Sequence, residues 1–169
     1  MSPKVIVICG PPGAGKTTYG RKLAAKKNAT FLDIDTVTEP MVRAGLAAAG
    51  RDPNDRDSPW FKQHFRTPIY ETLFQIAIDN LATQNVVIVG PFTQEIRDPD
   101  WLEQLASRLQ TEVEVHYVTC SPETRRQRMI DRGEPRDLPK LGDWETFLEY
   151  YNNESKPAFP HVLVDTDPS

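Results

Sequence analysis

The residues best suited to chemistry stand near the start of the chain, in the stretch GPPGAGKTT. From Gly10 to Thr17 this stretch fits the spacing G-x-x-x-x-G-K-[ST] of a phosphate-binding loop. It stands between an apolar run and a helical pattern, as the mechanism of such a loop requires. Glycines let backbone N–H groups turn inward around phosphate oxygens. The spacing therefore predicts a site for the phosphates of a nucleotide.

Each part of the loop has an expected role in binding ATP. Lys16 supplies a point charge to the β- and γ-phosphates, and the Thr17 hydroxyl is a ligand for Mg²⁺. A chance glycine-rich turn is the alternative interpretation, which the complete pattern and its flanks disfavour. The expected ATP-binding residues of this stretch are Gly10, Pro11, Pro12, Gly13, Ala14, Gly15, Lys16, Thr17 and Thr18.

Two carboxylates follow in the stretch FLDID, at the expected end of a strand. Because side chains alternate along a strand, Asp33 and Asp35 are expected to project to the same side. The carboxyl ends of parallel strands border the ligand crevice, so we expect Asp33 to hold Mg²⁺ and Asp35 to take a proton from an acceptor hydroxyl. In the alternative interpretation, Asp35 only caps a helix that starts at Thr36.

Basic residues gather late in the chain, in the stretch SPETRRQRMIDRGEPRDLPK. Helical spacing places Arg125, Arg128 and Arg132 on one face of a helix, although a solvated position is expected for Arg125. Glycine and proline then predict the end of the helix, which leaves Arg136 on a loop that can move. We expect a lid over about 132–142, in which Arg132 and Arg136 stabilise the transferring phosphoryl group and closure excludes water.

Length and composition limit what this site can belong to. The chain has 169 residues, of which 38% are hydrophobic and 26% charged, and this suits one globular domain over 1–169. No apolar run approaches the roughly 20 residues of a membrane span, so we expect a cytoplasmic protein without a leader. The net charge of −4 argues against a nucleic-acid partner. Cys9 and Cys120 are expected to be buried thiols.

Short apolar runs alternate with helical patterns, which predicts an α/β fold with a parallel sheet. The apolar runs lie at 4–9, 29–34, 85–90, 113–118 and 161–165. Helices are expected over 16–27, 36–49, 60–83, 99–109, 121–132 and 143–155. The region 36–83, broken near 50–59, forms a helical insertion between the second and third strands, where a substrate can be held.

Taken together, these stretches resemble small-molecule kinases of the P-loop phosphotransferase superfamily, gluconate kinases and shikimate kinases in particular. FLDID is similar to an F-x-D-x-D element of both, and PNDRDSPWF to an Asp-rich segment of gluconate kinases. HFRTPIYETL resembles a stretch of shikimate kinases whose arginine holds the substrate carboxylate. The resemblance implies a three-layer α/β/α fold with a five-stranded parallel sheet in the order 2-3-1-4-5 and a lid. It also implies transfer of the γ-phosphoryl group of ATP to a hydroxyl of a small, anionic, sugar-acid-like or polyol-like metabolite.

The same resemblance implies where the two substrates bind. Arg66 is the implied anchor for an anion, and Arg97 adds to it. The stretch GPFTQEIRD keeps Gly90 where shikimate kinases have several glycines, and this change reshapes the acceptor pocket. The implied acceptor-binding residues are Asp35, Trp60, Arg66, Gly90, Pro91, Phe92 and Arg97. The implied ATP-binding residues beyond the loop are Arg128, Arg132, Asp165 and Thr166.

Two other functions stay open at this point. A polynucleotide 5′-hydroxyl or nucleotide kinase shares the loop, the paired aspartates and the arginine lid, although the acidic chain has no basic stripe for a long nucleic acid. An ATP-binding sensor or hydrolase without a small-molecule acceptor needs the paired aspartates less. We expect a monomer or homodimer with no membrane partner.

Overall fold

The computed structural model describes residues 2–152 and 156–169. Within these residues, five strands form one sheet in the order β2-β3-β1-β4-β5, and all neighbouring strands are parallel. The expected fold class is therefore confirmed. The strands are β1 (Val5–Cys9), β2 (Thr30–Asp33), β3 (Val86–Val89), β4 (Val113–Thr119) and β5 (Val162–Asp165).

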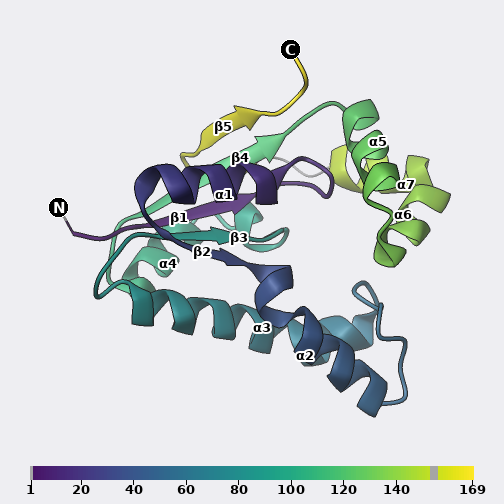
Figure 1. The fold of residues 1–169 in the computed structure, drawn as a ribbon, viewed down its shortest axis with the longest axis horizontal. Helices are drawn as coiled ribbons and strands as arrows, with labels where there is room; N and C mark the ends of the chain where they lie inside the picture. The colour runs from purple at the N-terminus through teal and green to yellow at the C-terminus, as the bar shows by residue number, and fades with distance from the viewer. Residues whose placement is uncertain (1, 153–155) are drawn as a thin grey trace.

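Helices cover both faces of this sheet: α1 lies on one face, and α3 and α4 lie on the other (Figure 1). The remaining helices gather at the end of the sheet to which the strand arrows point. Among the described residues, no helix is both long and apolar enough to span a membrane. The helices are α1 (Lys16–Lys27), α2 (Ile34–Ala48), α3 (Pro59–Asn80), α4 (Trp101–Leu109), α5 (Pro122–Arg132), α6 (Leu138–Gly142) and α7 (Trp144–Asn152), with 3₁₀ turns η1 (Glu95–Arg97) and η2 (Pro135–Asp137).

The central strand β1 explains why the sequence begins with an unbroken apolar run. All five of its residues are buried, since helices cover the sheet on both sides. Val5 and Val7 face the layer of α3 and α4, whereas Ile6 and Ile8 face α1. Cys9, at the end of the strand, is buried as expected.

The start of α2 differs from the expectation. The strand β2 ends at Asp33 and the helix begins at Ile34, two residues before Thr36. The N-cap of α2 is Asp33, whose Oδ1 accepts a hydrogen bond from the Asp35 N–H at 3.0 Å. The alternative in which Asp35 caps this helix is therefore wrong, and strand alternation does not orient Asp35.

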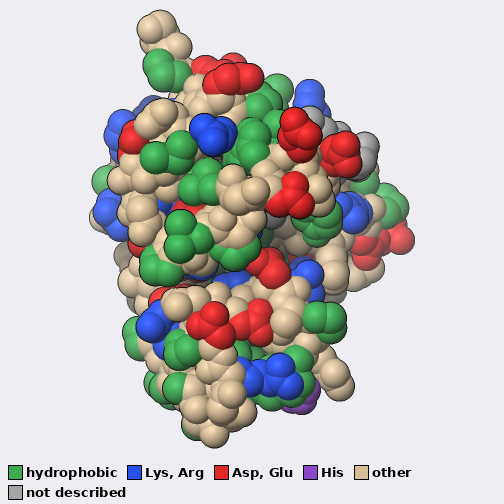
Figure 2. All heavy atoms as spheres, turned by 90° about the vertical axis from the view of Figure 1, so that its right-hand side faces the viewer, with side chains coloured by type: hydrophobic (Ala, Val, Ile, Leu, Met, Phe, Trp, Pro, Cys, Tyr) green, Lys and Arg blue, Asp and Glu red, His purple; other side chains and the backbone are tan. Residues whose placement is uncertain are grey.

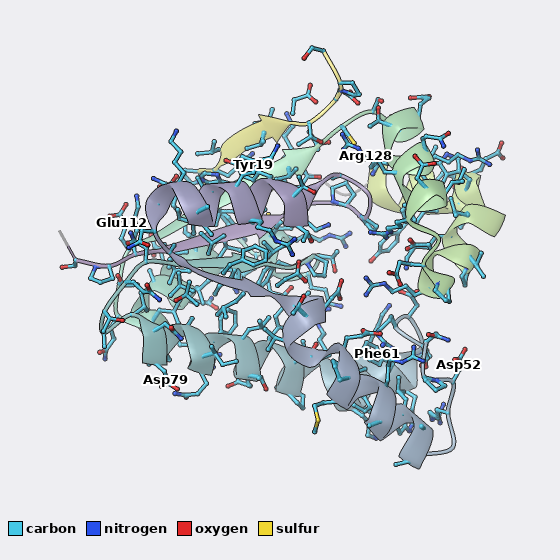
Figure 3. The ribbon with its side chains drawn as sticks, in the orientation of Figure 1. Tyr19, Asp52, Phe61, Asp79, Glu112 and Arg128 are labelled. Atoms are coloured by element: carbon cyan, nitrogen blue, oxygen red, sulfur yellow. The ribbon has the colours of Figure 1, made fainter. Side chains whose placement is uncertain are left out.

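The helices α2 and α3 form the expected insertion, joined by the segment 49–58. Val42, Leu46 and Phe61 pack between them, and Phe61 is labelled at this contact in Figure 3. Gly45 lets α2 and α3 approach closely, because a Cβ atom at this position would lie 2.9 Å from the Phe65 ring on α3.

Two expectations about the late helices are corrected. Arg125 is 4% exposed rather than solvated, because α5 packs on the phosphate loop, where a Cβ atom on Gly13 would lie 2.8 Å from the Arg125 carbonyl oxygen. The lid segment after Gly133 is not an open loop, since η2 and α6 occupy most of it. The expected helix over 143–155 is α7, and 153–155 lie outside the described residues.

The contact between α1 and the sheet gives a test of this packing. A Cβ atom on Gly20 would lie 2.6 Å from Val89 Cγ2 and 3.0 Å from Ile8 Cδ1. We expect Gly20→Ala to lower the free energy of unfolding by about 1–3 kcal/mol through overpacking, despite the better helix propensity of alanine. Denaturant unfolding measures this change. Gly142→Ala is the matched control, since no atom would lie within 4 Å of its Cβ; an equal loss in both variants would contradict the packing argument.

Candidate active site

One cavity of about 1120 Å³ lies at the carboxyl end of the strands. Its walls come from the phosphate loop, α1, α2, α3, the segment after β3, and the lid. Figure 2 faces this end of the molecule and shows a hollow with acidic and basic side chains along it. The expected site residues that line the cavity are Pro12, Gly13, Gly15, Lys16, Thr17, Thr18, Asp33, Asp35, Arg66, Gly90, Pro91, Arg128, Arg132, Arg136 and Thr166.

The phosphate loop, residues 10–15, owes its shape to its glycines. Gly10, Gly13 and Gly15 have φ angles of 137°, 78° and 90°, which residues with a side chain rarely adopt. At Gly10 a Cβ atom would also lie 2.1 Å from the carbonyl oxygen of Val118 on β4. The loop leads into the N-terminus of α1, where free N–H groups and the helix dipole favour an anion.

Lys16, the first residue of α1, lies in the cavity beside this loop. Its ammonium group donates a hydrogen bond to the Pro11 carbonyl at 2.9 Å. Burial lowers the pKa of Lys16 to about 8, although the nearby Asp35 carboxylate raises it. Phosphate oxygens beside the ammonium group would favour its charged form.

Thr17 and Asp33 meet next to the loop. The Thr17 hydroxyl donates to Asp33 Oδ2 at 2.6 Å, and Asp33 is 5% exposed. Because its proton is directed to Asp33, the hydroxyl can offer a lone pair to a cation. Mg²⁺ is usually bound by one or two protein oxygen ligands together with phosphates and water. This pair of oxygen donors fits the ion.

Asp35 faces the same cavity from the first turn of α2. Its side chain is 50% exposed, and its Oδ2 accepts a hydrogen bond from Arg136 Nη2 at 2.8 Å. The two aspartates thus line one cavity, but one ends a strand and the other begins a helix. The contact with Arg136 joins the lid to the insertion.

Glu39 and Arg56, which sequence reasoning missed, extend this contact into a chain of alternating charges. Glu39 accepts a hydrogen bond from Arg56 Nη2 at 2.7 Å and lies 3.9 Å from Arg136 Nη1. Both residues line the cavity. The position of Glu39 four residues after Asp35 on α2 is the signal that points to it, since residues at this spacing share a helix face. No sequence signal points to Arg56.

Arg132 stabilises the segment after α5, where the lid is expected. Its Nε and Nη2 donate to the two carboxylate oxygens of Asp137 at 2.5 and 2.7 Å, and Asp137 is 1% exposed. This bidentate contact holds η2 against the end of α5. Lys140 of α6 adds a second contact to the insertion, 3.6 Å from Asp57.

Arg66 lines the cavity from α3. Its Nη2 donates to both carboxylate oxygens of Glu95 at 2.8 and 2.7 Å, and its guanidinium group lies 5.2 Å from the centre of the Tyr70 ring. Burial raises the pKa of Tyr70, so its hydroxyl stays neutral. Among the described residues, Nε and Nη1 of Arg66 have no hydrogen-bond acceptor and can donate to a ligand.

Several expected site residues do not line the cavity. Phe92 is fully buried in the core. The guanidinium carbon of Arg51 lies 4.1 Å from the centre of the Trp60 ring, and the His64 ring stacks on Trp60 with 4.2 Å between the ring centres. Arg97 is exposed and does not line the cavity. The expected ATP-binding residues outside the lining are Gly10, Pro11, Ala14 and Asp165.

The chain can be compared with known proteins on this basis. Residues 5–153 match the AAA domain family AAA_33. A shikimate kinase of Francisella tularensis subsp. novicida is 28% identical over 167 residues, which cover 97% of this chain and 86% of that protein. A shikimate kinase of Corynebacterium efficiens is 38% identical over 63 residues, and this match spans only 37% of this chain and 36% of that protein.

Among solved structures, a gluconokinase of Sinorhizobium meliloti 1021 is similar in fold, with a TM-score of 0.61. It is 17% identical, and the alignment covers 99% of this chain and 85% of that one. The expected resemblance to P-loop small-molecule kinases is confirmed by these relatives, and the expected phosphotransferase class agrees with them. The chain belongs to the AAA domain family AAA_33.

Proposed function

We propose that the protein is an ATP- and Mg²⁺-dependent kinase that transfers the γ-phosphoryl group to a hydroxyl of a small, anionic, polyol-like metabolite. The observation that carries this proposal is the contact of Thr17 with Asp33 at 2.6 Å, with Asp35 beside it in one cavity. It sets a pair of metal-binding oxygens next to a half-exposed carboxylate that can serve an acceptor. The shikimate kinase relatives support the same chemistry.

The loop and α1 bind the triphosphate in this proposal. N–H groups at the start of α1 and the Lys16 ammonium group donate to phosphate oxygens, and Lys16 leaves the Pro11 carbonyl to do so. Thr17 and Asp33 would hold Mg²⁺, which neutralises charge on the phosphates when it is bound. The lid then excludes water, so that the acceptor hydroxyl reacts in its place.

Asp35 acts on the acceptor. As the acceptor oxygen bonds to the γ-phosphorus and ADP leaves, the hydroxyl proton passes to a carboxylate oxygen of Asp35. Arg136 donates to Oδ2 of that carboxylate, and release of this contact makes both carboxylate oxygens available to the acceptor hydroxyl. The guanidinium group is then free to stabilise charge on the transferring phosphoryl group.

Arg66 supports an anionic acceptor. Glu95 holds one nitrogen of its guanidinium group, which leaves the other N–H donors for a carboxylate or phosphate of the metabolite. Gly90 and Pro91 line the same cavity after β3 and would contact the acceptor through their backbone.

An acceptor screen tests the proposed function. Protein, ATP and Mg²⁺ are mixed with sugar acids, polyols, nucleosides and 5′-hydroxyl oligonucleotides, and ADP release is followed. We expect a small anionic polyol to raise ADP release well above the rate with water. Stimulation by the oligonucleotides alone would favour a polynucleotide kinase, and no stimulation by any compound would favour a sensor or hydrolase.

Asp35→Asn tests the assigned base. We expect this variant to keep its affinity for Mg-ATP and to lose about 10²–10⁴-fold in kcat, because proton acceptance is removed. Acceptor-dependent ADP release and Mg-ATP titration measure the two quantities. Asp79→Asn, on the exposed face of α3, is the control. Unchanged turnover of Asp35→Asn would exclude it as the base.

Arg66→Ala tests the anion anchor. Loss of a charged hydrogen-bond donor is expected to raise the acceptor KM by about tenfold or more and to leave the KM of ATP nearly unchanged. The control is Arg108→Ala, which removes a similar arginine–glutamate contact with Glu71 on the exterior of α3. Equal changes in both KM values would place the anchor elsewhere.

A further inference from the structure

The phosphate loop is held in place by residues that are distant in the sequence. The Thr166 hydroxyl, just after β5, donates to the Ala14 carbonyl at 2.6 Å. A trans peptide unit directs its C=O and N–H to opposite sides. Because the Ala14 carbonyl points to Thr166, the N–H of Gly15 in the same peptide unit points the opposite way, and Gly15 lines the cavity.

Arg128 of α5 fixes Thr166 in that position. Its Nη1 donates to the Thr166 hydroxyl at 2.9 Å, and its Nη2 donates to the Thr166 carbonyl at 2.6 Å. The Thr166 N–H donates to the Thr119 carbonyl at 2.9 Å, which ties this residue to the end of β4. A hydroxyl has one proton. Arg128 donates to the Thr166 oxygen, so this proton goes to a carbonyl. The Ala14 carbonyl at 2.6 Å is the nearer acceptor, since the Thr119 carbonyl lies at 3.2 Å.

Arg128 also contacts the loop directly. Its Nη1 lies 3.5 Å from the Gly13 carbonyl oxygen. A Cβ atom on Gly15 would lie 3.3 Å from that Nη1 and 3.4 Å from the Thr166 hydroxyl oxygen. Figure 3 labels Arg128 beside the loop that joins β1 to α1. Its guanidinium group is thus already bound to protein atoms on both terminal nitrogens.

We propose that Arg128 and Thr166 are positioning residues that hold the Ala14–Gly15 peptide unit with its N–H toward the triphosphate. They act through the backbone of the loop. This assignment rests on the proposed function, because it requires that the loop binds a triphosphate. It adds a role in positioning the loop to the expectation that these two residues contact ATP.

A contact with the nucleoside and a role in orienting the loop predict different effects on the binding of ATP and of tripolyphosphate. A residue that contacts the adenine or ribose strengthens the binding of ATP but not that of tripolyphosphate, which has no nucleoside. A residue that orients the loop strengthens the binding of both ligands by the same factor. Tripolyphosphate with Mg²⁺ therefore separates the two roles without any knowledge of the phosphoryl acceptor.

The experiment is titration calorimetry of the full chain with Mg-ATP and with Mg-tripolyphosphate. We expect Thr166→Val to weaken both ligands equally, by about five- to tenfold, as the loss of one hydrogen bond predicts. Thr166→Ser keeps the hydroxyl and is expected to bind both ligands within twofold of the unsubstituted protein. Arg128→Gln, which loses the fork of donors, is expected to follow Thr166→Val.

The matched control is Thr111→Val, which also removes a threonine hydroxyl bonded to a carbonyl, that of Pro3, outside the cavity. Thermal unfolding of all variants is measured in parallel. Weaker binding of ATP alone in Thr166→Val, no change for either ligand, or an equal loss in Thr111→Val would each overturn the proposal. Absence of binding by the unsubstituted protein would instead overturn the proposed function, and this assignment with it.

Discussion

A backbone N–H group can face a phosphate only if the carbonyl of the same peptide unit finds a partner on the other side. In this protein the Ala14 carbonyl, in the same peptide unit as the Gly15 N–H, finds its partner in the Thr166 hydroxyl. The glycine conformations of the loop make this geometry possible, and the end of β4 restricts the space around Gly10. Because α1 starts directly after the loop, the same geometry sets the positions of Lys16 and Thr17, on which the rest of the site depends.

Around this loop, four of the five arginines that line the cavity within the described residues pair with acids, and two of these pairs lie close to the expected acceptor site. Arg136 pairs with Asp35 and Arg66 with Glu95, each from a different segment of the chain. Such pairing compensates charges that have lost part of their water, and it also fixes the guanidinium groups in place. The two pairs then differ in what the reaction requires. In the proposed reaction, the pair of Arg66 can persist with an acceptor bound, whereas the pair of Arg136 opens when its guanidinium group moves to the transferring phosphoryl group.

The sequence predicted the features that depend on local pattern. The buried strands, the phosphate loop and Asp33 at the end of β2 all follow from residue types at short spacing, and the strands lie within one or two residues of their expected bounds. Asp35 reaches the cavity from α2 and not, as expected, by strand alternation. Features set by distant contacts could not be read in this way. Phe92 follows Gly90 and Pro91 in the sequence and was therefore expected to bind the acceptor, but its ring lies in the aromatic core. The bond from Thr166 to Ala14 joins residues 152 positions apart, and no spacing predicts it.

Titration of the protein with Mg-ATP, compared with Lys16→Ala, tests the central claim that this loop and its lysine bind a triphosphate. The account predicts saturable heat with one site per chain for the unsubstituted protein. For Lys16→Ala it predicts binding weakened by more than tenfold, because an ammonium group that donates to phosphate oxygens is lost. No heat from the unsubstituted protein, or the same affinity in both proteins, would contradict it.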